Sequence, residues 1–227
     1  MQSAAATIGE IVVPIRGERL HLLPERAIWW PRRSTLLVAD LHLGKEEALL
    51  DLGVPMPRGV LDETLARLER LIDRHEARRV VVLGDLVHAA RGLSAEVVDA
   101  VTRWRERVGG ELDLVPGNHD ELVPELPSSW RVTRRAAAVL DPPFVHLHDA
   151  RPSAAGYALG GHLHPMVRLD GRIDRVELPC FVIGVRRAIL PAFTLFSRGV
   201  RVVPDGGDRI YAVVDGSVVD CSSRAWA

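Results

Sequence analysis

The 227-residue chain contains little cysteine, few aromatic residues and a single lysine. Its two cysteines, Cys180 and Cys221, cannot form a disulfide scaffold, which favours a reducing compartment. No run approaches the ~18 apolar residues that a membrane-spanning helix needs. The first residues also lack the basic start and apolar stretch of a signal peptide. We therefore expect a cytoplasmic protein with no membrane association.

Excess charge of either sign is absent as well. The 29 basic and 30 acidic residues give a formal net charge of −1, which excludes a basic nucleic-acid-binding surface over the whole molecule but not a local one. Hydrophobic residues make up 47% of the chain, enough for a substantial core without disulfides. Because we find no repeat, low-complexity tract or linker, we expect a single domain over residues 1–227.

The first half of the chain alternates strand and helix patterns. Apolar runs at 34–39, 79–83 and 112–115 each end at polar residues, as short buried strands do. Between these runs, apolar residues recur at three- and four-residue spacing over 58–75, and again after Ser94, a favourable residue for a helix N-terminus. This order predicts right-handed crossovers and a parallel sheet covered by helices.

Helical periodicity fades after about residue 130. Short apolar runs punctuated by glycine, proline and aspartate replace it, which predicts a mostly antiparallel second sheet packed against the first. These runs are Phe144–Leu147, Tyr157–Leu159, Phe181–Val185, Phe193–Phe196, Val200–Val203 and Ile210–Val214. The residues before the first parallel strand predict a hairpin or edge strands. The expected class is α/β, with two sheets in one compact domain.

Seven of the nine histidines stand in or beside short segments rich in glycine, aspartate and asparagine. Five segments contain candidate ligands: Asp40-Leu41-His42, Gly84-Asp85, Gly117-Asn118-His119-Asp120, His146-Leu147-His148 and Gly161-His162-Leu163-His164. The first three follow the predicted parallel strands, whose carboxyl ends commonly form sites in open α/β sheets. Each segment alone is weak evidence, because glycine, asparagine and aspartate are ordinary turn residues. Their joint occurrence predicts a metal site.

The spacing within these segments indicates how side chains would share metal ions. Residues two apart in an extended chain project from one face, so Asp40 and His42 can reach one ion. A sharp turn after Gly160 and Gly161 would direct His162 and His164 toward two neighbouring ions.

Oxygen ligands complete the predicted site. Asp85, at the end of the central strand, would bridge two ions through its carboxylate oxygens, and Asn118 would offer a carbonyl oxygen. A mixture of imidazole nitrogens and hard oxygens suits manganese, iron or zinc better than calcium. Two ions about 3.5–4 Å apart acidify a shared water and clamp the oxygens of a phosphorus centre. The predicted chemistry is hydrolysis of a phosphate ester.

This ordered set resembles the calcineurin-like, binuclear metallophosphoesterase superfamily over residues 36–165. More narrowly, the stretches LLVADLHLGKE, VVLGDLVH, LVPGNHD and GYALGGHLHP are similar to PdeM-type metallophosphoesterases, described as ligase-associated DNA damage response endonucleases. The resemblance implies a four-layer α/β/β/α sandwich of two mixed sheets flanked by helices, without a separate cap domain. It also implies two divalent ions, with manganese favoured.

The resemblance further implies a role for each motif residue. The implied ligands of the first metal are Asp40, His42, His164 and bridging Asp85, and those of the second are Asp85, Asn118, His148 and His162. His119 would stabilise the transition state or protonate the leaving oxygen, and Asp120 would orient His119. Only one of His146 and His148 is required as a ligand, and His148 is favoured because it lies nearer the expected strand end.

Several other residues have two interpretations. His88 stands where the protein phosphatases of the superfamily have an aspartate, which argues against that activity; it either contacts the scissile phosphate or caps a turn. Lys45 and Arg91 are candidate phosphate contacts, although Lys45 can also be an ordinary solvated residue. Trp29 and Trp30 could stack on bases, but core or edge packing is expected.

Our leading hypothesis is a phosphodiesterase that cleaves single-stranded or unpaired DNA in a repair pathway. The DNA substrate, and an association with a DNA ligase, exonuclease or helicase, follow from the resemblance alone. The alternatives are a phosphodiesterase or pyrophosphatase for a small nucleotide, and a catalytically silent scaffold. Erosion of the ligand motifs would mark a silent scaffold, whereas here every motif position is filled.

Overall fold

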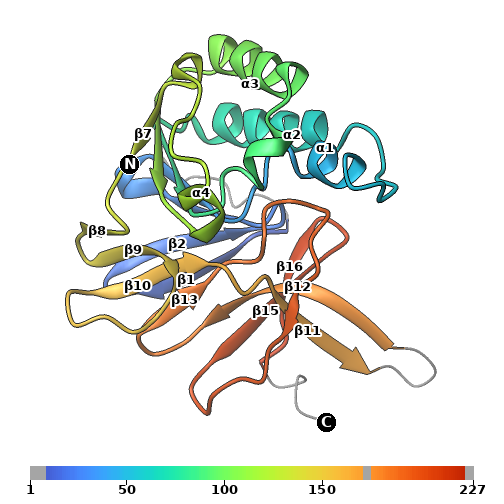
Figure 1. The fold of residues 1–227 in the computed structure, drawn as a ribbon. Helices are drawn as coiled ribbons and strands as arrows, with labels where there is room; N and C mark the ends of the chain where they lie inside the picture. Colours follow the sequence, from blue (N-terminus) through green and yellow to red (C-terminus); the bar gives the residue numbers. More distant parts are fainter. Residues whose placement is uncertain (1–8, 171–174, 223–227) are drawn as a thin grey trace.

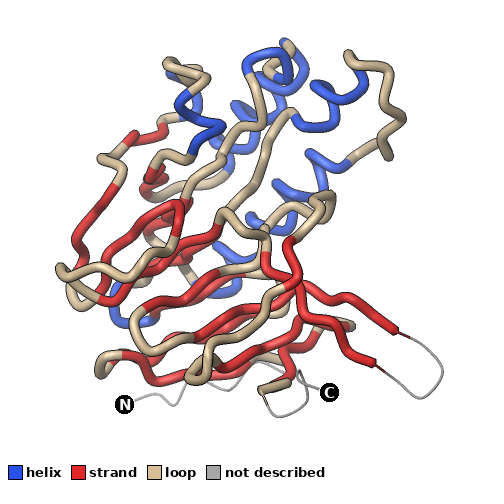
Figure 2. The backbone as a smooth tube through the Cα atoms, turned by 60° about the horizontal axis from the view of Figure 1, so that its bottom comes forward, coloured by secondary structure: helices blue, strands red, loops and turns tan. Residues whose placement is uncertain are grey.

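The computed structural model describes residues 9–170 and 175–222, which form two β-sheets with helices on one side (Figure 1). The α/β class with two sheets is confirmed. The two sheets pack face to face, and the helices lie against the first (Figure 2). Among the described residues, no helix is long and apolar enough to cross a membrane.

The first sheet follows chain order from β1 to β7 within the described residues. Its antiparallel part is β1 (Ile11–Ile15), β2 (Glu18–Leu23) and β3 (Ala27–Trp30), which confirms the predicted edge strands. Its parallel part is β4 (Thr35–Val38), β5 (Arg79–Leu83), β6 (Glu111–Val115) and β7 (Val132–Arg134). The carboxyl ends of β4, β5 and β6 therefore lie at the same edge of the sheet.

Helices connect the parallel strands and cover one face of the sheet. The α-helices are α1 (Lys45–Leu50), α2 (Val60–His75), α3 (Ala95–Arg107) and the single-turn α4 (Asn118–Glu121). The 3₁₀ turns are η1 (Pro31–Arg33), η2 (Ala90–Gly92) and η3 (Ser128–Trp130). The predicted cap of α3 is confirmed, because Ser94 accepts a hydrogen bond from the Val97 N–H at 3.4 Å. Leu68 and Trp104 anchor α2 and α3 in one apolar cluster with the sheet.

The second sheet contains the strands that follow residue 137. They are β8 (Ala138–Asp141), β9 (Phe144–Asp149), β10 (Tyr157–Gly161), β11 (Pro165–Asp170), β12 (Arg175–Ile183), β13 (Arg187–Ile189), β14 (Val200–Arg201), β15 (Arg209–Val214) and β16 (Ser217–Asp220). Their order is β14-β11-β12-β13-β10-β9-β8, with β15 beside β12 and β16 beside β15. Antiparallel pairs predominate, as predicted, but β10 pairs parallel to both β9 and β13. No helical pattern marks those crossovers in the sequence.

Each sheet buries a separate set of side chains. Leu37 and Val81 of the first sheet meet Phe144 and Phe181 of the second in a shared core. The outer face of the second sheet carries a smaller cluster that includes Cys180. In the described ranges, every helix precedes residue 131, so helices cover the first sheet and none covers this smaller cluster. The loss of helical periodicity after residue 130 accounts for this difference between the two outer faces.

The run Phe193–Phe196 does not form the predicted strand. Its residues form bends, and the Phe193 N–H donates to the carbonyl of Ala39 at 2.7 Å, in the segment after β4. Phe193 is completely buried, whereas Phe196 is 41% exposed. The apolar run therefore reflects one buried anchor and neighbouring exposed residues rather than the two buried faces of a strand.

The tryptophans and cysteines occupy structural positions. Trp30 is completely buried, with its ring 4.9 Å from that of Phe144, and Trp29 is only 9% exposed. Core packing of both residues is thus confirmed. Cys180 and Cys221 are buried free thiols.

Candidate metal centre

The first candidate ligands follow β4, where the chain turns instead of staying extended. Asp40 and His42 adopt the left-handed conformation, with φ of 56° and 50°. The expected extended geometry is therefore wrong for this segment. The turn separates Leu41 and Leu43, which are buried in the core under the helices, from the two polar side chains. Those side chains meet His164, whose Nε2 lies 3.5 Å from Asp40 Oδ1 and 3.3 Å from His42 Nε2.

Asp85 lies between the two groups of histidines. Its Oδ2 is 3.5 Å from His148 Nε2, 3.9 Å from His42 Nε2 and 4.0 Å from His119 Nε2. Its Oδ1 accepts a hydrogen bond from the His119 backbone N–H at 3.0 Å. Burial raises the pKa of Asp85, and the nearby His148 opposes this rise. The Asp85 carboxylate is therefore within reach of side chains from both groups.

The second group gathers around His148. Its Nε2 lies 2.9 Å from His162 Nδ1 and 3.1 Å from Asn118 Oδ1. His162 and His164 thus lie on different sides of the site, in agreement with the turn expected before them; their φ values are 71° and 47°. Asn118 is the first residue of α4, directly after the loop that follows β6.

Backbone carbonyls orient two of the candidate ligand imidazoles. His148 Nδ1 lies 3.0 Å from the Leu83 carbonyl, and His164 Nδ1 lies 3.1 Å from the Arg198 carbonyl. A carbonyl only accepts hydrogen bonds, so each Nδ1 carries the proton and each Nε2 presents a lone pair to the site. Metal-binding histidines are commonly oriented in this way. Sequence reasoning missed these contacts because they come from backbone atoms, which no residue pattern reveals.

The donor set fits divalent transition metals. Three sets of side chains have possible ligand atoms within 4.8 Å of one another: Asp40/His42/His164, Asp40/Asp85/His148 and His42/His88/His119. Imidazole nitrogens face each other in two places, and the buried Asp40 Oδ1 has no hydrogen-bond partner among the described residues. Lone pairs that converge without a donor between them are stabilised by a cation. Nitrogen and oxygen donors together suit manganese, iron or zinc.

Protonation of the site is opposed by burial. Burial, followed by repulsion from His164, lowers the pKa of His42 to about 2. Burial and the charge of His119 lower the pKa of His88 to about 4. Burial also disfavours protonation of His164, but its interaction with Asp40 outweighs this effect and raises its pKa. His42 is therefore neutral at pH 7, as an imidazole must be to coordinate a metal.

Two glycines allow the segments to approach one another. Gly84 has a φ of 84°, and a Cβ there would overlap the His148 ring. A Cβ at Gly161 would overlap the Asp40 carboxylate. The site therefore requires glycine at both positions because a larger residue would displace a candidate ligand side chain.

His88 and His119 form a stacked pair beside this centre. Their ring centroids are 4.9 Å apart, and His119 Nδ1 lies 2.6 Å from the His88 backbone carbonyl. The structure thus brings His88 to the site, where its ring also lies 5.4 Å from that of His42. His119 Nδ1 must donate to the carbonyl, which leaves Nε2 as the nitrogen that exchanges a proton.

Asp120 does not orient His119 as expected. Its carboxylate accepts hydrogen bonds from the backbone N–H of Gly117 at 2.9 Å and of Val87 at 3.2 Å. Asp120 is completely buried and joins the loop after β6 to the loop after β5. The orienting group for the His119 ring is instead the His88 carbonyl. His148 lies in the site, whereas His146 is completely buried elsewhere and neither of its ring nitrogens has a hydrogen-bond partner among the described residues. Regular alternation would place both side chains on one face of β9. The pairing of β9 with β10 shifts register after His146, so the strand is irregular between the two histidines.

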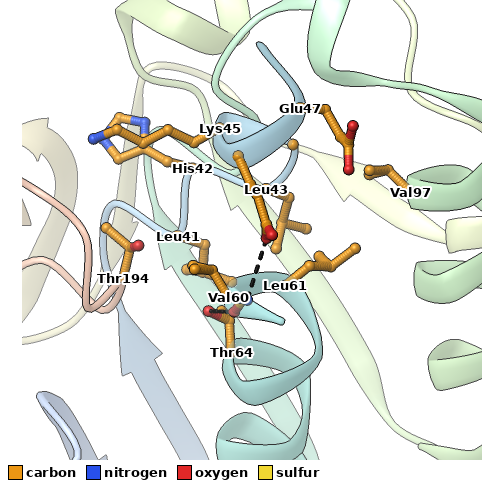
Figure 3. Close-up of a pocket in the computed structure, with 12 residues that line it drawn as sticks. Leu41, His42, Leu43, Lys45, Glu47, Val60, Leu61, Thr64, Val97 and Thr194 are labelled. Carbon is orange, nitrogen blue, oxygen red and sulfur yellow. Dashed lines mark hydrogen bonds between the residues drawn. The ribbon is translucent and has the colours of Figure 1, made fainter. Parts of the chain in front are cut away.

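Lys45 and His42 line the same small pocket, which Figure 3 shows together with Thr194. Lys45 is the first residue of α1, and burial lowers its pKa. Arg91 lies in η2, where its side chain is exposed and its charge acts on His88. Both cations therefore lie on the side of the site formed by the loops after β4 and β5.

Comparisons with known proteins agree with this arrangement. A family model described as calcineurin-like phosphoesterase matches residues 34–169. No curated protein matches. Among solved structures, the nuclease MPE of Pseudomonas putida is 34% identical with a TM-score of 0.83, over 93% of this chain and 99% of that chain.

Two other solved structures match more weakly. Yfce, a phosphoesterase from E. coli, is 16% identical with a TM-score of 0.41, over 82% of this chain and 96% of that chain. A protein of unknown function from Aquifex aeolicus is 14% identical with a TM-score of 0.40, over 56% of this chain and 77% of that chain. The family model spans more than half of the chain and the Pseudomonas structure nearly all of it. This chain therefore belongs to the calcineurin-like phosphoesterase family and is a metal-dependent hydrolase.

Proposed function

We propose that this hydrolase is a phosphodiesterase that cleaves single-stranded or unpaired DNA with the help of two divalent ions. The observation that carries the proposal is the convergence of two histidine groups on Asp85, whose Oδ2 lies 3.5 Å from His148 Nε2 and 3.9 Å from His42 Nε2. Such a bridging carboxylate is suited to two neighbouring ions. The nuclease activity named for the Pseudomonas protein supports nucleic acid as the substrate class.

We propose the following ligand assignment. Asp40, His42, His164 and Asp85 hold one ion, and Asp85, Asn118, His148 and His162 hold the other. The contacts of His164 with Asp40 and of His162 with His148 support this division. Manganese is the proposed metal, with iron and zinc as the other ions that this nitrogen and oxygen set accepts.

When bound, the ions supply positive charge at the phosphate and acidify water near neutral pH. The protein's own residues then orient the ester and move a proton. His119, held at Nδ1 by the His88 carbonyl, delivers a proton from Nε2 to the departing oxygen and stabilises charge on the phosphate. His88 contacts the same phosphate, Lys45 and Arg91 contact the nucleic-acid backbone, and Asp120 holds the two loops that carry this pair.

We further propose a role in DNA repair, in association with a DNA ligase, exonuclease or helicase. This part rests on the similarity of four sequence stretches to PdeM-type endonucleases. We also take residues 1–227 as one metallophosphoesterase domain without a separate cap domain. Apolar contacts between the two sheets support this organisation.

The experiment is incubation of purified protein and manganese with labelled single-stranded DNA, duplex DNA and a cyclic dinucleotide. The proposal predicts faster cleavage of the single strand, and Asp85→Ala should abolish manganese-dependent cleavage of every substrate. Turnover of the cyclic dinucleotide alone would favour the small-nucleotide alternative. Undiminished cleavage by Asp85→Ala would contradict the two-ion mechanism.

A further inference from the structure

The loop Phe193–Val200, called here the 193–200 loop, is tied to the metal centre at both ends. At one end, the Thr194 N–H donates to the Asp40 carbonyl at 3.2 Å. At the other end, the Val200 N–H donates to the His164 carbonyl at 3.2 Å, and the Arg198 carbonyl accepts from His164 Nδ1 at 3.1 Å. The two ends of the loop therefore lie beside residues of the metal centre, Asp40 and His164.

Two arginines hold the first part of this loop. The Arg67 guanidinium donates to the Phe193 carbonyl and lies 4.1 Å from the Phe193 ring centroid. Arg26 Nη1 donates to the Thr194 carbonyl at 2.8 Å. Arg67 is only 6% exposed, and burial together with the charge of Arg26 lowers its pKa to about 10. The guanidinium groups of buried Arg67 and half-buried Arg26 thus hold two successive backbone carbonyls of the loop.

The middle of the loop, by contrast, exposes apolar surface. Leu195 is 46% exposed, Phe196 41% and Val200 55%. The Phe196 N–H donates to Thr194 Oγ1 at 3.3 Å, which fixes the backbone that carries the aromatic ring. Three exposed apolar side chains in a loop that is tied to the metal centre are candidates for contact with a ligand.

The charge of this region selects the kind of ligand. Residues 193–201 contain two arginines and no aspartate or glutamate, in a chain whose formal net charge is −1. Arg198 and Arg201 in this stretch are exposed. Lys45 adds another cation, since it lines the same pocket as Thr194. An exposed aromatic ring in the same loop as an exposed arginine matches a single-stranded nucleic acid, which offers base faces and phosphates together.

We infer that the 193–200 loop is a stacking platform for single-stranded nucleic acid, on which Phe196 stacks with a nucleobase and Arg198 contacts the adjoining phosphate. The inference rests on the proposed function and adds a basis for its strand preference. A base inside a duplex is covered on both faces by its neighbours, so it cannot stack on Phe196. A base in a frayed or single-stranded segment has a free face and can stack on Phe196.

Binding in the presence of excess chelator tests this platform without any turnover. The probe is a dye-labelled twelve-residue oligothymidylate, and its anisotropy reports binding. Phe196→Ala should weaken binding about tenfold, whereas Phe196→Trp should restore it. The matched control is Val203→Ala, because Val203 is 87% exposed but lies beyond β14, outside the loop. Arg198→Gln should weaken binding and reduce its dependence on salt.

A strand of the same length without bases distinguishes stacking from a general loss of structure. The ratio of wild-type to Phe196→Ala affinity should be about tenfold with bases and should fall on the abasic strand. The inference would be overturned if this affinity ratio were equal on the two strands. It would also be overturned if Phe196→Ala bound as tightly as the wild type, or if the wild type did not bind.

Failure of the proposed function has a different signature. Manganese-dependent cleavage of the abasic strand reports on the metal centre, whereas chelator-treated binding reports on the loop. An inactive protein that still shows base-dependent binding through Phe196 would refute the phosphodiesterase proposal alone. If the protein cleaves DNA but its oligonucleotide affinity is unchanged by Phe196→Ala, the stacking platform alone would be refuted.

Discussion

At the scale of single residues, the site depends on backbone conformations that side chains disfavour. Five of its candidate residues are left-handed without being glycine: Asp40, His42, Asp85, His162 and His164. Each such residue costs about 1 kcal/mol or more unless its surroundings compensate. The residue types were readable from the sequence, but these conformations were not, because they arise from contacts between distant segments. The extended geometry predicted for Asp40 and His42 failed for this reason.

Gly84→Ala tests how tightly the segments fit. The new Cβ would overlap the His148 ring, so we expect weaker manganese binding and a loss of unfolding free energy. Gly17→Ala is the matched control, because Gly17 has a φ of 82° but nothing lies within 4 Å of its Cβ position. That control should lose only about 1–2 kcal/mol, the cost of a left-handed conformation. Urea titration and calorimetry measure both quantities; equal effects of the two substitutions would refute the steric argument.

His119→Ala tests the proposed proton donor. Since His119 is not among the proposed ligands, the variant should retain both metal ions and lose about 100- to 10,000-fold in rate. Metal analysis of the purified variant and single-turnover cleavage provide the two readouts. Loss of metal in parallel with activity would instead make His119 a ligand.

At the scale of elements, the predicted site follows from three parallel strands that end at one edge. The positions of β4, β5 and β6 were predictable because each is a short apolar run followed by polar residues. The 193–200 loop was not, because its apolar run has the composition of a strand. Its path depends on partners outside the run, half-buried Arg26 and buried Arg67, that no local pattern indicates.

Arg67→Gln should loosen this loop. The substitution removes a buried guanidinium from the Phe193 carbonyl, and an unsatisfied buried carbonyl costs about 1–3 kcal/mol. Because the next residue donates to the Asp40 carbonyl, we also expect weaker metal binding. Arg70→Gln is the control on the same helix, since Arg70 is exposed and pairs only with Glu63 in the contacts described. Similar stability and metal affinity in the Arg67→Gln and Arg70→Gln variants would argue against a role of Arg67 in holding the loop.

At the scale of the whole molecule, two sheets from separate halves of the chain meet at the metal centre. His148, His162 and His164 come from the second sheet and its loops, while the remaining proposed ligands follow strands of the first. The two-sheet architecture was predictable from the change in periodicity near residue 130. The parallel pairing of β10 with β9 and β13 was not, because no helical pattern marks those crossovers in the sequence.

Metal binding should therefore stabilise the packing of the two halves. Manganese at a concentration 100 times its dissociation constant should raise the unfolding free energy by about 2.7 kcal/mol for each site, because only the folded chain assembles the ligands. Denaturant titrations with manganese and with chelator measure the difference, and Asp85→Ala should show almost none. An equal gain in that variant would place the stabilising ions elsewhere.

The most direct test of the two-ion account is anomalous diffraction from crystals grown with manganese. The account predicts two peaks about 3.5–4 Å apart. One should lie among Asp40, His42 and His164 and the other among Asn118, His148 and His162, with the Asp85 carboxylate touching both. A single peak, or ions bound outside this cluster, would contradict it.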